Sequence, residues 1–183
     1  PLVQAGGWVT PGGDLDRQGH GDESLPPILQ VRWEVQLGLP VQGAPALSDG
    51  VAYVGSAGNF KVQGSLFAIS LTDGKMLWEF RPQAVEGSFP ESFPSGATVA
   101  GGLVFASGLR GAVYALDLKT GTLEWKYGAS EEIRTQPLMA GDKVIVALAN
   151  GHTVALKAAT GQVLWETASD AEQPSTLTLW GDT

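Results

Sequence analysis

One arrangement of alanine, glycine and tryptophan occurs three times, and it constrains the fold of this chain more than any other feature. In each copy an alanine precedes a tryptophan by ten residues, and a glycine precedes the same tryptophan by four. The tryptophans are 47 residues apart (78 to 125) and then 40 residues apart (125 to 165), and Trp33 precedes the first of them by 45. A period near 40 residues indicates a repeat architecture. The copies contain Ala68, Gly74 and Trp78; Ala115, Gly121 and Trp125; and Ala155, Gly161 and Trp165.

Each repeat has the pattern of four short strands. In the third copy, apolar runs over residues 137–140, 143–148, 153–156 and 163–167 are separated by glycine-containing turns. Such turns favour hairpins because glycine adopts positive φ without a steric penalty. Four strands in about 40 residues are typical of a β-propeller blade. We therefore predict an all-β propeller of four-stranded antiparallel blades, with Trp78, Trp125 and Trp165 buried at equivalent positions between blades. A β-sandwich with core tryptophans is the alternative.

The repeats divide the chain into an N-terminal loop segment, residues 1–30, and a run of blades over residues 31–183. Complete units are expected over residues 45–80, 96–127 and 137–167. A single outer strand is expected around Trp33, and a truncated unit from residue 175, because residues 175–182 align with residues 135–142. Propellers typically need four to eight blades to close. We therefore expect a partial propeller; a short chain that closes its ring by self-association is the alternative.

Residue counts exclude several kinds of site. The chain has no cysteine and two histidines, which excludes disulfides, thiolate zinc sites, cysteine nucleophiles and a three-histidine metal site. Its 11 basic and 19 acidic residues give a net charge of −8, which argues against binding nucleic acid. The longest purely apolar run, residues 144–149, is far shorter than the ~20 residues that a transmembrane helix needs.

The second copy carries a fuller motif, formed by Ala115, Asp117, Thr120, Gly121 and Trp125. This motif resembles the pyrroloquinoline-quinone (PQQ) repeat, the tryptophan-docking motif of quinoprotein-like propellers. The other copies depart from it at Ser70, Asp73 and Lys157. The N-terminal residues 8–19 and 26–33 also resemble the start of BamB-like propellers in the same superfamily.

The resemblance implies a noncatalytic scaffold for protein–protein interaction, with a BamB-like role in cell-envelope and outer-membrane protein assembly. It also implies an extracytoplasmic location, in the periplasm or at the cell surface, while a cytoplasmic location stays open. The expected partners are proteins, which include the remainder of the chain's own propeller or a second copy. Two alternatives are a fragment of a PQQ-dependent dehydrogenase and a ligand-sensing propeller of a larger kinase or surface protein.

The resemblance also bears on cofactors. Dehydrogenases of this superfamily hold a calcium-bound quinone, and many stack it on a vicinal disulfide. Because this chain has no cysteine and no matching calcium-ligand or acid motif, we predict no cofactor, no metal and no catalytic residue.

The loop lengths point to one end of the blades as the partner-binding face. Residues 56–63 lengthen the connection between the second and third strands of the first blade, and residues 81–94 lengthen the connection to the next blade. Aromatic and arginine residues on loops of a rigid scaffold are favoured at binding hot spots. The alternative is that Phe89 and Phe93 tuck beneath their own loop. The candidate partner-binding residues are Phe60, Lys61, Arg81, Phe89, Phe93, Arg110 and Arg134.

Overall fold

The computed structural model describes residues 30–168 and residue 177. Within these residues the chain forms twelve short strands. In the same residues, no helix has the length and apolar character needed to cross a membrane. The strands are β1 (Ala46–Ser48), β2 (Val51–Gly55), β3 (Leu66–Ser70), β4 (Met76–Phe80), β5 (Thr98–Ala100), β6 (Leu103–Gly108), β7 (Ala112–Asp117), β8 (Leu123–Gly128), β9 (Leu138–Ala140), β10 (Lys143–Ala147), β11 (Thr153–Lys157) and β12 (Val163–Thr167).

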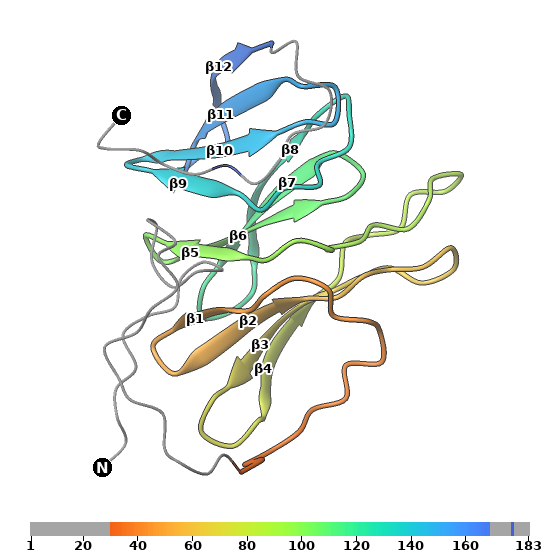
Figure 1. The fold of residues 1–183 in the computed structure, drawn as a ribbon, viewed down its shortest axis with the longest axis vertical. Coiled ribbons are helices and arrows are strands. Elements are labelled where there is room, and N and C mark those ends of the chain that lie inside the picture. Colours follow the sequence, from red (N-terminus) through yellow and green to blue (C-terminus); the bar gives the residue numbers. More distant parts are fainter. Residues whose placement is uncertain (1–29, 169–176, 178–183) are drawn as a thin grey trace.

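The strands form three four-stranded antiparallel sheets in sequence order, β1 to β4, β5 to β8 and β9 to β12. The sheets follow one another as blades along an arc (Figure 1). The short first strands β1, β5 and β9 lie beside one another, and the tryptophan-bearing strands β4, β8 and β12 form one edge of each sheet. This arrangement confirms the predicted fold class, a partial propeller of four-stranded blades.

Trp78 and Trp125 each pack on the glycine turn of the following blade. A Cβ atom added to Gly121 would lie 2.6 Å from the ring of Trp78, and one added to Gly161 would lie 2.6 Å from the ring of Trp125. The indole Nε1 of Trp78 donates to the Leu118 carbonyl at 3.2 Å, and that of Trp125 donates to the Ala158 carbonyl at 2.8 Å. The accepting carbonyl lies three residues before the glycine in both cases. The repeated glycine thus forms the seat for the preceding blade's ring.

The alanine of each repeat lies opposite the tryptophan of its own blade. Ala68 pairs with Trp78, Ala115 with Trp125, and Ala155 with Trp165 across the last two strands. In every blade the register shifts immediately after this pair, so that one residue before the tryptophan bulges out of the ladder. A bulge bends the strand and re-aims its side chains. The same bulge therefore precedes the tryptophan in all three blades.

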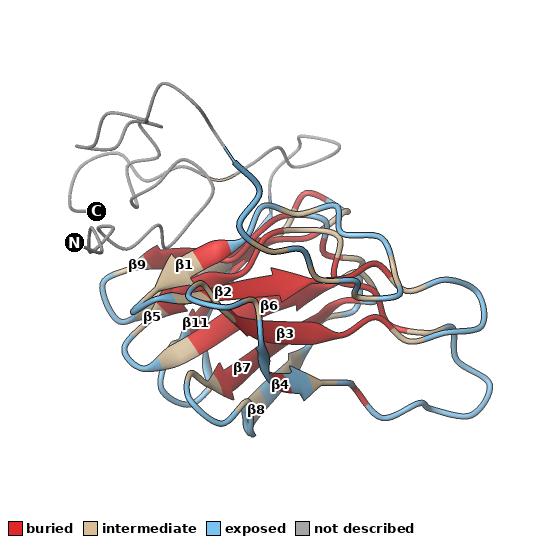
Figure 2. Ribbon diagram, turned by 90° about the horizontal axis from the view of Figure 1, so that it is seen from below, coloured by how far each residue is buried: buried red, intermediate tan, exposed pale blue. Residues whose placement is uncertain are grey.

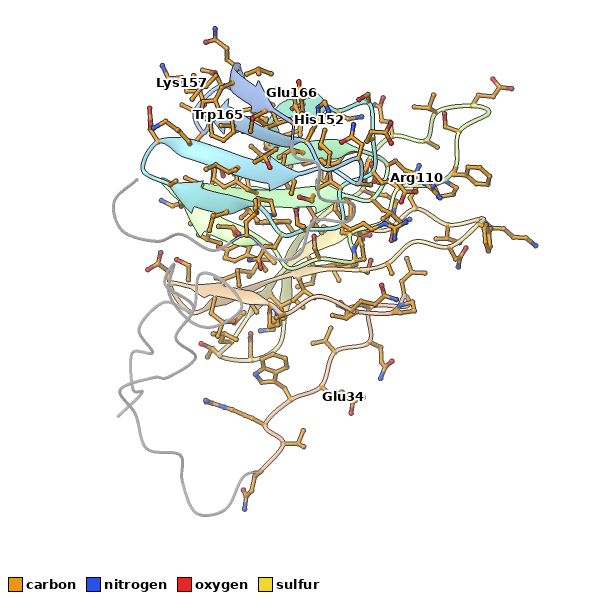
Figure 3. All side chains as sticks on the ribbon, turned by 45° about the horizontal axis from the view of Figure 1, so that its top comes forward. Glu34, Arg110, His152, Lys157, Trp165 and Glu166 are labelled. Atoms are coloured by element: carbon orange, nitrogen blue, oxygen red, sulfur yellow. The ribbon has the colours of Figure 1, made fainter. Side chains whose placement is uncertain are left out.

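The ends of the arc differ from the expectations. Trp33 packs on Gly74 and donates to the Leu71 carbonyl at 3.0 Å, but its segment forms no strand, because no neighbouring strand within the described residues pairs with it. Trp78 is 9% exposed and Trp125 is half-buried, whereas Trp165 is 40% exposed, so the prediction of equivalent burial is wrong, most clearly for Trp165. The reason is that no glycine turn of the described residues covers its ring at the end of the arc (Figure 3). Apart from residue 177, the expected unit from residue 175 lies outside the described residues.

The middle blade is buried on both of its faces. Val104 and Ala106 of β6 point into the core shared with the first blade, whereas Phe105 between them points into the core shared with the third. Figure 2 shows this pattern as buried inner strands with more exposed outer strands. The period of two in a strand therefore supplies two apolar interfaces from one continuous apolar run.

The tight turns gather at one end of the blades, which we call the Gly-turn face. In each blade a backbone hydrogen bond joins the turn after the third strand to the turn after the first strand. These bonds run from Leu71 N to Gly50 O at 2.9 Å, from Leu118 N to Gly102 O at 2.9 Å, and from Ala158 N to Asp142 O at 2.8 Å. The connections at the opposite end form the long-loop face.

Tyr53 makes the first interface sensitive to alkaline pH. Its hydroxyl donates to the Leu118 carbonyl at 3.3 Å, and burial, with the charges of Asp49 and Asp117, raises the pKa of Tyr53 to about 12. A tyrosine in the unfolded chain ionises near pH 10, so the folded state keeps a proton that the unfolded state loses. We expect the free energy of unfolding to fall between about pH 10 and pH 12, by at most ~1.4 kcal/mol per pH unit from this group.

Urea unfolding across this pH range measures the effect. Tyr53→Phe is a mild control, because Phe105 occupies the equivalent position in the second blade. The variant should lose stability less steeply than the wild type as the pH rises. An equal slope in both proteins would contradict the assignment to Tyr53.

Candidate functional site: the long-loop face

The long-loop face consists of the connections 56–65, 81–97, 109–111, 129–137 and 148–152. The first two project from the same side of the sheets (Figure 1). Backbone hydrogen bonds tie their bases together: Gly64 N donates to Glu91 O at 2.8 Å, and Phe93 N donates to Ser56 O at 3.1 Å. Leu109 N donates to Ser92 O at 2.8 Å and connects them to the second blade. These loops therefore rest on two blades at once.

Three of the candidate residues are joined in one group. The Arg110 guanidinium lies 5.0 Å from the centre of the Phe89 ring, a cation–π distance. Arg110 also lies 3.6 Å from a Glu132 carboxylate oxygen, and the other oxygen pairs with Arg134 at 2.7 Å. Phe89 is 64% exposed, so the ring remains accessible on its other side. The group presents one aromatic ring and two guanidinium groups on adjoining loops (Figure 3 labels Arg110).

The other exposed candidates lie on the first blade. Arg81 donates to the Ser65 hydroxyl at 3.1 Å and pairs with Glu79 at 2.6 Å. The same hydroxyl donates to Glu79, and this bond is the largest cause that lowers the pKa of the Glu79 carboxyl. Phe60 is 86% exposed at the tip of the loop 56–65. The Asn59 side chain shapes this tip by accepting hydrogen bonds from the backbone amides of Lys61 and Val62, two and three residues further on.

The prediction that Phe93 lies on the partner-binding face is wrong. Its side chain is fully buried, and its ring packs edge-on against Tyr114 at a centroid distance of 5.4 Å. The backbone approaches so closely that a Cβ atom at Gly55 would lie 2.9 Å from the Cβ of Phe93. The alternative of a satellite core is therefore right for Phe93, whereas Phe89 stays exposed.

Glu91 is a feature of this face that the sequence reading missed. It is 7% exposed, and its carboxylate accepts hydrogen bonds from the Arg110 amide at 2.9 Å and the Tyr114 hydroxyl at 3.1 Å. Burial and this carboxylate raise the pKa of the Tyr114 hydroxyl. A lone glutamate between Pro90 and Ser92 shows no periodic pattern that would mark it as buried. The sequence signal that could have indicated its burial is Gly108, because the absence of a side chain there leaves space for the Glu91 carboxylate.

The remaining polar pair of note is exposed. His152 Nδ1, in the connection before β11, lies 2.8 Å from Glu166 Oε1 of β12 on the third blade. In the part of the chain that the structure describes, no group of three or more histidine, aspartate or glutamate side chains is placed to hold a metal ion.

Comparison with known proteins gives relatives of several activities. The chain is 33% identical over 136 residues to a polyvinylalcohol dehydrogenase of Sphingopyxis sp. (strain 113P3), which covers 67% of this chain and 20% of the relative. It is 36% identical over 115 residues to the serine/threonine-protein kinase AfsK of Streptomyces griseus, covering 63% and 12%. It is 32% identical over 98 residues to the outer membrane protein assembly factor BamB of Escherichia coli (strain K12), covering 52% and 24%. The chain thus spans about a quarter or less of the length of these relatives.

Solved structures share the fold. BamB from Moraxella catarrhalis has a TM-score of 0.64 at 21% identity, over 76% of this chain and 41% of its own. A europium-containing methanol dehydrogenase has a TM-score of 0.72 at 24% identity, over 91% of this chain and 32% of its own. The family described as outer membrane protein assembly factor BamB matches residues 63–181, which include the last two strands of the first blade and all strands of the next two. With the tryptophan-docking repeat, this match shows that the chain belongs to the BamB-like family of PQQ-repeat propellers.

Proposed function

We propose that this chain acts as a noncatalytic scaffold that binds protein partners through the long-loop face. The observation that carries the proposal is the accessible group of Phe89, Arg110 and Arg134 on loops held by two blades. Arginine and aromatic side chains are enriched at binding hot spots. Loops on a rigid scaffold cost little ordering entropy when a partner binds. Phe60 extends the same face with a second accessible ring.

The relatives named outer membrane protein assembly factors support a role in the cell envelope. On this proposal the chain works outside the cytoplasm, and its partner is a protein that takes part in outer-membrane assembly. The Gly-turn face has tight turns held by backbone hydrogen bonds, which gives it a structural role.

A quinone-dependent dehydrogenase is the second candidate, and the polyvinylalcohol dehydrogenase relative favours it. The side chains of the described residues do not fit the quinone and calcium that such an enzyme holds. The chain has no cysteine for a vicinal disulfide, and the described residues bring no three carboxylate or histidine side chains together. We expect no stoichiometric submicromolar binding when the purified chain is titrated with the quinone and calcium and followed by absorbance. Tight binding with dye-linked alcohol oxidation would favour the dehydrogenase.

Site-specific photo-crosslinking tests the proposed face. A photoreactive phenylalanine analogue at Phe60 and at Phe89 should give adducts with one and the same partner in cells. The analogue at Lys119 or Lys75, both exposed beside the glycine turns, serves as the control and should give none. Adducts from the glycine turns with none from Phe60 or Phe89 would overturn the face assignment.

Alanine variants of the three phenylalanines separate binding from folding. Phe60→Ala and Phe89→Ala should weaken binding to the crosslinked partner by about tenfold each, with little change in Tm. Phe93→Ala removes a fully buried ring and should cost ~3–5 kcal/mol of stability, while binding per folded molecule stays unchanged. Loss of stability in Phe60→Ala or Phe89→Ala without loss of affinity would show that these rings serve folding rather than binding.

A further inference from the structure

We infer that Glu91 is a positioning residue of the long-loop face, whose carboxylate holds Phe89 and Arg110 in one fixed arrangement. The inference deepens the proposed function and rests on it for its biological meaning. The arrangement itself is a property of the chain and is measurable without a partner.

Glu91 joins three segments through both its backbone and its side chain. One carboxylate oxygen accepts hydrogen bonds from the amides of Arg110 at 2.9 Å and Ser92 at 3.1 Å, and the other accepts from the Tyr114 hydroxyl at 3.1 Å. Its own carbonyl accepts from Gly64 N, and its amide donates to the Gln63 side chain. The loops 56–65 and 81–97 and the β6–β7 turn therefore meet at this one residue.

Two glycines leave room for this meeting. A Cβ atom at Gly108 would lie 2.5 Å from the carboxyl carbon of Glu91, and a Cβ atom at Gly58 would lie 2.3 Å from its carbonyl oxygen. Neither glycine is among those with positive φ. Glycine is needed at both positions because it leaves space, and a side chain at either position would displace Glu91.

The location of Glu91 connects it to the accessible group. It lies two residues after Phe89, and it holds the backbone of Arg110, whose guanidinium faces the Phe89 ring at 5.0 Å. Arg110 in turn contacts Glu132, which pairs with Arg134. A buried carboxylate with three donors is a strong anchor, since hydrogen bonds to a charged group are stronger than neutral ones and an unsatisfied carboxylate is costly to bury. Moving Glu91 therefore moves Phe89 relative to both arginines.

The test measures the Phe89–Arg110 arrangement by NMR. The Phe89 ring current shifts the side-chain signals of Arg110, and Phe89→Ala defines the unshifted position. In Glu91→Ala we expect the Arg110 signals to move to that position, and the Arg110 amide to exchange at least about tenfold faster. Glu86→Ala, an exposed acid on the same loop, is the matched control and should leave both readouts unchanged.

A conservative variant separates positioning from simple stability. Glu91→Gln keeps the shape of the side chain, and its oxygen still accepts from the Arg110 and Ser92 amides. It should retain the Arg110 shift. The pKa of Tyr114 should fall part of the way toward the ordinary tyrosine value, because burial still raises it but the neighbouring charge is gone. If Glu91→Ala does not fold, Glu91→Asp withdraws the carboxylate by one methylene and should lose most of the shift.

Retention of the full Arg110 shift in Glu91→Ala, or in Glu91→Asp if only that variant folds, would overturn the inference. This outcome is distinct from failure of the proposed function. If no partner crosslinks to Phe60 or Phe89, the NMR result for Glu91 still stands or falls by itself.

Discussion

Replacing Gly121 with alanine is expected to destabilise the chain by roughly 3 kcal/mol. Two costs add at this position. Gly121 has φ +71°, a conformation that costs alanine about 1 kcal/mol or more. The new Cβ would also lie 2.6 Å from the indole of Trp78, so the ring must leave its seat and the interface between two blades must repack.

Gly141→Ala is the matched control for the backbone cost alone. Gly141 has φ +60° in a turn of the same face, and a Cβ atom there meets open space. This variant should lose only about 1 kcal/mol, measured by urea unfolding. Equal losses in the two variants would mean that the contact between ring and glycine contributes nothing.

Trp78→Ala should cost ~3–5 kcal/mol, as expected for deleting a buried tryptophan, whereas Trp165→Ala should cost about 1 kcal/mol or less. The two residues occupy the same place in their repeats and face equivalent alanines. They differ in what covers them: Trp78 is 9% exposed and bonded to the Leu118 carbonyl, while Trp165 is 40% exposed.

A double-mutant cycle makes this prediction sharper. In the Trp78→Ala background the ring that clashes with residue 121 is absent, so adding Gly121→Ala should cost only as much as Gly141→Ala. If Gly121→Ala costs as much in the Trp78→Ala background as in the wild type, its cost comes from the backbone conformation rather than from the contact with the Trp78 ring. Near-equal losses for Trp78→Ala and Trp165→Ala would show that docking on the next blade adds little.

The repeat could be recognised in the sequence because its spacing follows from the pairing of two strands that are adjacent along the chain. Ala68 and Trp78 are cross-strand partners, so a ten-residue separation is fixed by two short strands and the turn between them. The same local rules predicted the strands of each blade and the tight turns. The spacing does not show which tryptophan packs on a given glycine. The ring on Gly121 belongs to Trp78, 43 positions earlier (78 to 121), in the preceding blade.

The long-loop face was harder to predict because its side chains are placed by contacts between loops. Phe89 and Phe93 lie in one irregular segment, and no periodicity says that the first is exposed and the second buried. Phe93 is buried because its amide is bonded to Ser56 and because Gly55 admits its backbone. Glu91 depends in the same way on Gly108, which is 17 residues away (91 to 108).

The tryptophan seat has a consequence for how such proteins diversify. Every blade carries an indole on its last strand and, in the turn just before that strand, the glycine that receives its neighbour's indole. The indole and the glycine that receives a neighbouring indole therefore lie in one segment of about 40 residues. A duplicated or transplanted blade brings a compatible surface for whichever blade precedes or follows it, and chains can gain or exchange blades without inventing a new interface. Selection is then free to act on the connections at the opposite end, where one common framework can be fitted to unrelated tasks.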